Sequence, residues 1–184
     1  MKQKLKLALV GAGERGQYCY APYAKMHGYE IEFVAVADPH KGRREKFVQD
    51  YHVPAEGVFE TAEQFFARPR MADAVLICTQ DSQHYAYACQ AIDLGYSILL
   101  EKPISPSVRE CLDLQRRAEE KGTQIMVCHV MRYTKFYRKL KELIDSGVIG
   151  DVVHVTHTEN VAYWHYAHSY VRGNWHKTAD SSPM

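Results

Sequence analysis

Residues 11–16 read Gly11-Ala12-Gly13-Glu14-Arg15-Gly16, and this stretch decides the fold. The G-x-G-x-x-G follows a short apolar run at residues 5–10 and opens a stretch compatible with a helix ending near Gly28. Asp38 stands about 20 residues further on, at the end of a second apolar run at residues 31–37. A strand, a glycine turn, a helix and a strand closed by an acidic residue form the dinucleotide-binding fingerprint. The sequence therefore predicts a βαβ unit that binds a dinucleotide.

Each position of this fingerprint has a physical role. We expect Gly11 to permit the tight turn, Gly13 to let the backbone approach the pyrophosphate, and Gly16 to bring the helix close to the strand. The first amides of that helix then point at phosphate oxygens. Asp38 would accept hydrogen bonds from the adenosine ribose hydroxyls, and its charge would repel a 2′-phosphate, which favours NAD over NADP.

Two arginines keep NADP as an alternative. Arg43 and Arg44 follow Asp38 on a helix predicted over residues 41–51. They would meet a 2′-phosphate if they faced the site, although a solvated basic helix face is the simpler interpretation.

Strands and helices continue to alternate as far as residue 128. Further apolar runs predict strands at residues 74–78, 97–100 and 125–128. Capping boxes begin at Thr61 and Ser107, and helices end at Gly95 and Gly122. This alternation predicts an α/β fold, with a Rossmann-type doubly wound parallel sheet over residues 1–128.

The pattern changes after residue 128. Phe136, Leu140, Leu143 and Ile144 mark one face of a helix, and residues 152–158 alternate as a half-buried strand. One helix and one or two strands cannot close a core by themselves. We therefore expect residues 129–184 to begin a second α+β domain that is truncated or completed by a partner. An unfinished sheet also favours a homo-oligomer formed through that domain.

Composition excludes several classes of protein. Lys and Arg number 23 against 22 Asp and Glu among the 184 residues, of which 46% are hydrophobic. This is ordinary globular composition, without a positive field to hold nucleic acid or an anionic membrane. The apolar run near the N-terminus breaks too early for a signal peptide, and we expect no membrane span. Unpaired spacing indicates reduced, mostly buried thiols at Cys19, Cys78, Cys89, Cys111 and Cys128. Together these features favour the cytoplasm.

Two further segments follow predicted strands, where ligands of an open α/β sheet bind. Residues 79–84 read Thr79-Gln80-Asp81-Ser82-Gln83-His84, and residues 101–103 read Glu101-Lys102-Pro103. With the glycine motif and Ala37-Asp38-Pro39, these segments resemble the glucose-fructose oxidoreductase/inositol dehydrogenase (Gfo/Idh/MocA) family. Residues 129–133, 146–150 and 171–175 are similar to further family segments in the same order.

The resemblance implies an NAD(P)-dependent oxidoreductase that acts on a CH–OH group of a sugar, cyclitol or related polyol. It implies a second domain with a large open antiparallel sheet, and it places Lys102 near the nicotinamide as the catalytic residue. The Lys102-Pro103 bond is often cis in such families, at a small energetic cost. Lys102 is also an implied cofactor contact, together with Gly11, Gly13, Glu14, Arg15, Gly16, Asp38, Thr79, Gln80, His84, Glu101, Arg132 and Trp175.

The implied reaction transfers a hydride between a hydroxyl-bearing carbon and nicotinamide C4. Lys102 would position the hydroxyl oxygen and relay its proton, and a nicotinamide that turns positive would favour the neutral amine. Gln80 departs from a common family Pro, and His176 from a frequent Arg. The family's catalytic Asp and His lie downstream of the segment that matches residues 180–184. We therefore expect the chain to bind cofactor in part and to be inactive alone.

Other interpretations stay open. A sensor or regulatory module would keep the dinucleotide site without a complete reaction centre, and a redox-assisted glycosidase of the same fold would use NAD transiently. A metal site is not expected, because His154 and His157 would point to opposite faces of a strand. These histidines, with His165, His168 and His176, would line a sugar pocket or be solvated or structural side chains. Tyr163, Trp164, Tyr166 and Trp175 would stack on a sugar or pack in the second domain.

Overall fold

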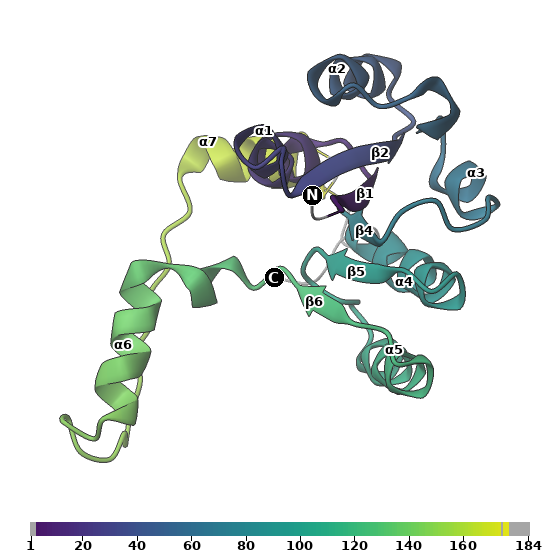
Figure 1. Ribbon diagram of the computed structural model, residues 1–184. Helices are drawn as coiled ribbons and strands as arrows, with labels where there is room; N and C mark the ends of the chain where they lie inside the picture. Colours follow the sequence, from purple (N-terminus) through teal and green to yellow (C-terminus); the bar gives the residue numbers. More distant parts are fainter. Residues whose placement is uncertain (1–2, 174, 177–184) are drawn as a thin grey trace.

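The computed structural model describes residues 3–173 and 175–176 (Figure 1). Its main feature is a sheet of six parallel strands in the order β3-β2-β1-β4-β5-β6. The strands are β1 (Leu5–Val10), β2 (Ile31–Ala37), β3 (Val58–Phe59), β4 (Ala74–Ile77), β5 (Ser97–Leu100) and β6 (Ile125–Val127). The chain reverses its direction of winding between β1 and β4, which is the topology of the Rossmann fold. The predicted doubly wound sheet is confirmed, and the two-residue edge strand β3 is an addition to it.

Helices cover both faces of this sheet. They are η1 (Glu14–Tyr20), α1 (Pro22–Met26), α2 (Lys41–Tyr51), η2 (Ala55–Gly57), α3 (Ala62–Phe66), η3 (Asp81–Gln83), α4 (His84–Asp93) and α5 (Val108–Lys121). Leu7 and Leu9 of β1 pack with α1 and α2, whereas Ala8 and Val10 pack with α3, α4 and α5. Alternate residues of one strand thus enter two separate cores, as a parallel sheet buried on both faces requires.

The first helix is not continuous. Residues 14–20 form a π-helical segment in which Ala21 N donates to Gly16 O at 3.0 Å, and α1 then begins at Pro22. Proline has no N–H to continue a helical ladder, but it fits the first turn of a new helix. The stretch that the sequence predicts as one helix is therefore two.

The side-chain caps predicted at Thr61 and Ser107 are present at the starts of α3 and α5. The Thr61 hydroxyl accepts from Gln64 N at 3.2 Å, and the Ser107 side chain caps α5 in the same way. Gly122 ends α5 with φ +63°. These local signals set the helix boundaries because their hydrogen bonds satisfy backbone groups that the helix itself leaves unpaired.

Beyond β6 the chain forms η4 (Val130–Tyr133), α6 (Lys135–Asp145), α7 (Tyr163–Tyr166) and η5 (Ala167–Val171). The helix predicted near residues 136–144 is present as α6, which projects away from the sheet with its apolar face exposed (Figure 1). The strand predicted over residues 152–158 is wrong. That segment is exposed throughout, with Val153 at 95%. An alternating pattern forms a strand only where a second strand takes up its hydrogen bonds, and no strand in residues 3–173 pairs with it.

The prediction that the cysteines are mostly buried is corrected by the structure. All five cysteines are free thiols, but only Cys128 is buried; Cys78, Cys89 and Cys111 are half-buried and Cys19 is exposed.

Within the described residues, no three His, Cys, Asp or Glu side chains gather in a metal-binding arrangement. Over the same residues, no helix combines the length and apolarity needed to cross a bilayer. Asn174 and residues 177–184, which belong to the predicted start of the second domain, lie outside the described residues.

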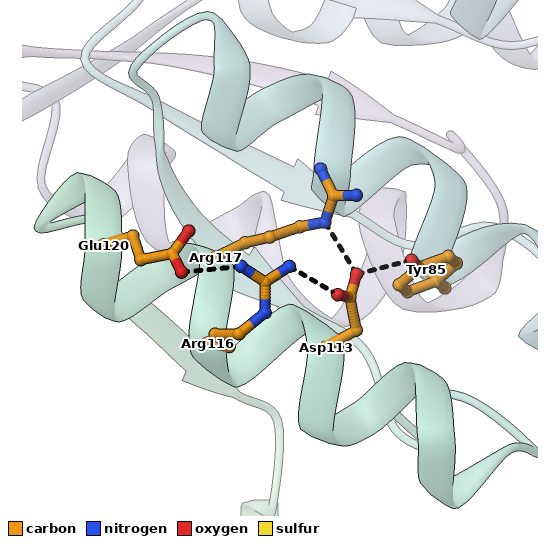
Figure 2. Close-up of polar contacts among 5 residues, drawn as sticks. All are labelled: Tyr85, Asp113, Arg116, Arg117 and Glu120. Atoms are coloured by element: carbon orange, nitrogen blue, oxygen red, sulfur yellow. Dashed lines mark hydrogen bonds and ion pairs between the residues drawn. The ribbon is translucent and has the colours of Figure 1, made fainter.

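A polar network joins α4 to α5 on the outer side of the sheet (Figure 2). The Asp113 carboxylate accepts from Tyr85 Oη at 2.7 Å, from Arg117 Nε at 2.6 Å and from Arg116 Nη2 at 2.8 Å. Arg116 also pairs with Glu120 at 2.6 Å. Hydrogen bonds from Arg116, Tyr85 and Arg117 lower the pKa of Asp113, and the bond to Asp113 raises the pKa of Tyr85 to about 12.

This network predicts a specific pH dependence of stability. A carboxyl whose pKa is lower in the folded state stabilises the fold above its unfolded pKa, here near 3.8, and this contribution is lost as the pH falls further. We expect Asp113→Asn to unfold at lower denaturant concentration than the wild type at pH 7, with the difference shrinking below pH 4. Urea unfolding followed by circular dichroism between pH 7 and 3 measures it. Glu119→Gln on the same helix is the control, and a difference that persists unchanged at pH 3 would contradict the assignment.

Candidate dinucleotide site

The predicted site residues follow the carboxyl ends of neighbouring strands. Asp38 follows β2, Gly11 follows β1, Thr79 comes shortly after β4, and Glu101 follows β5. Because all strands are parallel, these ends meet at one edge of the sheet, on both sides of the reversal between β1 and β4. Open α/β sheets bind their ligands at this switch point. The fold thus gathers the glycine turn, the acidic residue and the lysine segment into one row.

Two glycines of the turn are required by the packing of the protein itself. Gly11 has φ +95°, and a β-carbon there would lie 2.5 Å from the Cys78 carbonyl oxygen. A β-carbon at Gly16 would lie 2.4 Å from Gly11 O and 2.8 Å from Leu9 Cδ1. Real side chains do not approach this closely, so these positions bring the helix and β4 against the turn.

Gly13 is different, because nothing in the protein demands a glycine there. Its backbone is extended, with φ −78°, and the nearest atom to an added β-carbon is Arg43 Nη1 at 4.0 Å. The space above Gly13 is therefore one that a side chain would fill and that the chain keeps empty. This is the position at which the fingerprint brings the backbone against a pyrophosphate.

The packing at Gly11 predicts a large loss of stability on substitution. We expect Gly11→Ala to lower the free energy of unfolding by about 1–3 kcal/mol more than Gly122→Ala does. Both glycines have a positive φ, but nothing lies within 4 Å of a β-carbon at Gly122, so only the Gly11 variant has the clash with Cys78. Guanidinium unfolding of both variants measures the difference, and equal losses would contradict the packing argument.

Asp38 fastens the glycine turn to the end of β2. Its Oδ2 accepts from Ala12 N at 2.8 Å and its Oδ1 from His40 N at 2.8 Å. Each carboxylate oxygen accepts more than one hydrogen bond, so a ribose hydroxyl can share this acceptor. The hydrogen bonds that the Asp38 carboxylate accepts from Ala12 N and His40 N were not predicted from the sequence.

The interpretation of Arg43 and Arg44 as a solvated pair is half wrong. Arg44 is buried; its Nη1 donates to Asp38 O at 2.6 Å and its Nη2 pairs with Glu60 at 3.2 Å. Arg44 is thus occupied in holding the strand end. Arg43 is exposed and is the arginine that faces the space above Gly13.

His84 connects the two loops that follow β4 and β5. It is 1% exposed; its Nδ1 lies 2.6 Å from Pro103 O and its Nε2 3.2 Å from Thr79 O. Because the buried His84 ring contacts both backbones, it positions the two loops relative to each other. Gln80 is held through its backbone N–H, which donates to Gln83 Oε1 at 3.2 Å.

The lysine segment has the predicted cis bond between Lys102 and Pro103. The Lys102 side chain is exposed, whereas Glu101 beside it is 6% exposed. Glu101 Oε1 accepts from Tyr20 Oη at 2.5 Å, and Oε2 accepts from Lys102 N at 2.8 Å. Sequence reasoning did not single out Tyr20, which stands 81 positions before its partner.

Two thiols and a tyrosine near Glu101 have pKa values above their ordinary range. Burial raises the pKa of Cys78 well above its ordinary value, and burial also raises the pKa of Cys128. Burial and hydrogen bonds to Cys128 and Glu101 raise the pKa of Tyr20 in the same way. These raised pKa values favour the neutral form of all three groups near pH 7.

The residues present fit a dinucleotide. Gln17 Nε2 and Thr79 Oγ1 are buried beside the glycine turn and have no hydrogen-bond partner within the described part of the chain. Buried polar atoms are normally paired, so these two point to a polar ligand at this edge. The open space above Gly13 points to the same ligand.

Some of the predicted cofactor contacts have no comparable support in the structure. Glu14 and Arg15 are exposed on η1, where Arg15 Nη1 lies 3.8 Å from Cys19 Sγ. Arg132 is exposed on η4 and Trp175 is half-buried in a turn after η5. No hydrogen bond or ion pair of residues 3–173 and 175–176 joins the side chain of Arg132 or Trp175 to the row. Their roles stay predictions.

The fold and this row of residues define a dinucleotide-binding Rossmann domain. The chain belongs to the Gfo/Idh/MocA oxidoreductase family with its NAD-binding Rossmann fold, since the family model matches residues 5–129. The family resemblance inferred from the motifs is thereby confirmed, and so is NAD as the cofactor of this fold.

Two curated relatives of this chain are named inositol dehydrogenases. The chain is 31% identical over 157 residues to inositol 2-dehydrogenase of Pseudomonas savastanoi pv. phaseolicola, covering 83% of this chain and 46% of that protein. It is 29% identical over 156 residues to scyllo-inositol 2-dehydrogenase (NAD(+)) of Bacillus subtilis, covering 84% and 44%. The chain thus spans less than half the length of these relatives.

A solved structure shares the fold. The crystal structure of the WlbA dehydrogenase from Chromobacterium violaceum, in complex with NADH and UDP-GlcNAcA, superposes with a TM-score of 0.73 at 18% identity. The match covers 82% of this chain and 42% of that one.

Proposed function

We propose that this chain carries the cofactor site of an NAD(P)-dependent dehydrogenase that oxidises or reduces a hydroxyl-bearing carbon of a cyclitol, sugar or related polyol. One observation carries the proposal: the glycine turn, Asp38 and Lys102 stand in one row at the switch point of the sheet. The activities of the named relatives support the substrate class. The activity, substrate and partners of the whole protein belong to the proposal, because the chain spans less than half of those relatives.

Each residue of the row has a task in this proposal. The turn at Gly13 receives the pyrophosphate, and Asp38 accepts from the adenosine ribose. When bound, the nicotinamide supplies the hydride acceptor or donor. Lys102 orients the substrate hydroxyl and takes its proton at Nζ during oxidation, returning it during reduction. Glu101 fixes the Lys102 backbone through the hydrogen bond that its carboxylate accepts from Lys102 N.

Arg43 makes NADP a second cofactor to test. Its guanidinium borders the space above Gly13, and Arg44 is already engaged with Asp38 and Glu60. An exposed arginine beside the adenosine half would accommodate a 2′-phosphate, whereas the Asp38 carboxylate opposes it. We propose NAD as the preferred cofactor on the strength of Asp38.

The proposal also covers the part of the chain beyond β6. We propose that residues 129–184 begin the substrate and oligomerisation domain, and that the exposed apolar face of α6 packs within it. Phe136 is 70% exposed, and Leu140, Leu143 and Ile144 are partly so, which leaves a stripe on α6 for a partner element to cover.

A two-part experiment tests the function. NADH and NADPH are first titrated into the protein and followed by nicotinamide fluorescence. Cyclitols and sugars, beginning with myo-inositol and scyllo-inositol, are then screened with NAD and NADP by absorbance at the wavelength of the reduced nicotinamide. We expect saturable NADH binding and reduction of NAD by a cyclitol or sugar. Binding without any turnover would favour a regulatory module, and the absence of binding would contradict the site itself.

A further inference from the structure

We infer that Tyr20 is a positioning residue for Lys102: its hydroxyl holds the buried Glu101 carboxylate, and that carboxylate holds the backbone amide of Lys102. The inference rests on the proposed function for the role of Lys102. The contacts that carry it are those of the chain itself.

The backbone of Glu101 is fixed, so its carboxylate is the adjustable link. Glu101 N donates to Ile77 O at 2.9 Å, which extends the ladder between β4 and β5 by one residue. The chain leaves the sheet at Lys102, and Lys102 N returns a hydrogen bond of 2.8 Å to Glu101 Oε2. The direction in which the Lys102 segment leaves the sheet therefore depends on where this carboxylate points.

Tyr20 determines where it points. The 2.5 Å bond from Tyr20 Oη occupies Oε1, and the Lys102 amide occupies Oε2. A carboxylate at 6% exposure has little water to replace a lost donor. If the hydroxyl is removed, the cost of leaving Oε1 unpaired favours rotation of the carboxylate toward solvent, and that rotation breaks the bond to Lys102.

The same contact joins the two halves of the site. Tyr20 ends η1, the segment that begins directly after Gly13, while Glu101 belongs to the loop that presents Lys102. The hydrogen bonds from Tyr20 to Glu101 and from Lys102 to Glu101 thus connect the segment after the glycine turn to the lysine segment. This gives Tyr20 a part in lysine placement that its exposed neighbour Tyr18 lacks.

Amide hydrogen exchange followed by NMR on the full chain tests the inference. We compare the wild type with Tyr20→Phe, which keeps the ring and removes the hydroxyl. The Lys102 amide should exchange about tenfold faster or more in the variant, the loss expected for one hydrogen bond to a charged group. The amides of Ile98, Leu99 and Leu100 in β5 should be unchanged. Tyr18→Phe, which removes a hydroxyl from a residue 56% exposed on the same segment, is the matched control and should leave Lys102 as in the wild type.

Unchanged exchange of the Lys102 amide in Tyr20→Phe would overturn the inference. If that variant loses the protection of β5 as well, Glu101→Gln decides instead. Its neutral oxygen is a weaker acceptor, so the Lys102 amide should exchange faster than in the wild type, and an unchanged rate would overturn the inference. NADH titration of the same samples keeps the two proposals apart. A wild type that fails to bind NADH contradicts the proposed function, while the exchange rates still decide the role of Tyr20.

Discussion

Replacing Gly13 by valine should abolish measurable NADH binding and leave the fold intact. A valine fits the extended backbone at this position, and its side chain enters space where the nearest protein atom is 4.0 Å away from the β-carbon. We expect the free energy of unfolding to stay within about 0.5 kcal/mol of the wild type. The branched side chain would occupy the place of the pyrophosphate, so the dissociation constant for NADH should rise at least about 100-fold, or roughly 2.7 kcal/mol.

Two comparisons make this result interpretable. Gly13→Ala introduces a smaller group and should lose less affinity than valine. Gly11→Ala should instead lose stability, because its β-carbon meets the Cys78 carbonyl. Fluorescence titration with NADH and urea unfolding of each variant separate the two effects. A Gly13→Val protein that binds NADH as the wild type does would show that the dinucleotide does not lie on the turn.

Replacing Lys102 by alanine should stop turnover and spare cofactor binding. The Lys102 side chain is exposed, and in the proposed function its amine takes the proton of the substrate hydroxyl. A general acid–base group contributes about 10²–10⁴-fold to a rate, so we expect kcat with the cyclitol or sugar identified by the screen to fall by about that factor. The proposed pyrophosphate and adenosine contacts follow β1 and β2 instead of β5, so the dissociation constant for NADH should change by no more than about threefold.

Lys121→Ala, at the last turn of α5, is the matched control for removing an exposed lysine. Steady-state kinetics and NADH titration of both variants give the two quantities. Full turnover in Lys102→Ala would remove Lys102 from the reaction. Loss of NADH binding in that variant would make Lys102 a binding residue instead of an acid–base group.

The features predicted correctly from the sequence are those that short spacings encode. The glycine motif, the N-cap side chains of Thr61 and Ser107 and the closing glycine at position 122 all act on residues close to them in the sequence. Their local geometry therefore does not depend on which other elements pack around them. Alternating strands and helices then restrict the topology, since parallel strands need helical crossovers.

Contacts between residues far apart in the sequence could not be predicted from such short spacings. The hydrogen bond from Tyr20 to Glu101, the bonds of His84 to two loops and the burial of Arg44 against Asp38 exist only once the sheet is assembled. A polar residue in the sequence looks the same whether it is solvated or anchors a loop. The strand predicted over residues 152–158 was wrong for a related reason: alternation describes one strand, whereas a sheet requires the neighbour that pairs with it.

The most direct test of the central claim is a crystal structure of this protein grown with NADH. We predict the pyrophosphate against residues 11–16, the adenosine ribose within hydrogen-bonding distance of Asp38, and the nicotinamide ring beside Lys102 Nζ. A dinucleotide bound elsewhere, or a Lys102 amine directed away from the nicotinamide, would contradict the account.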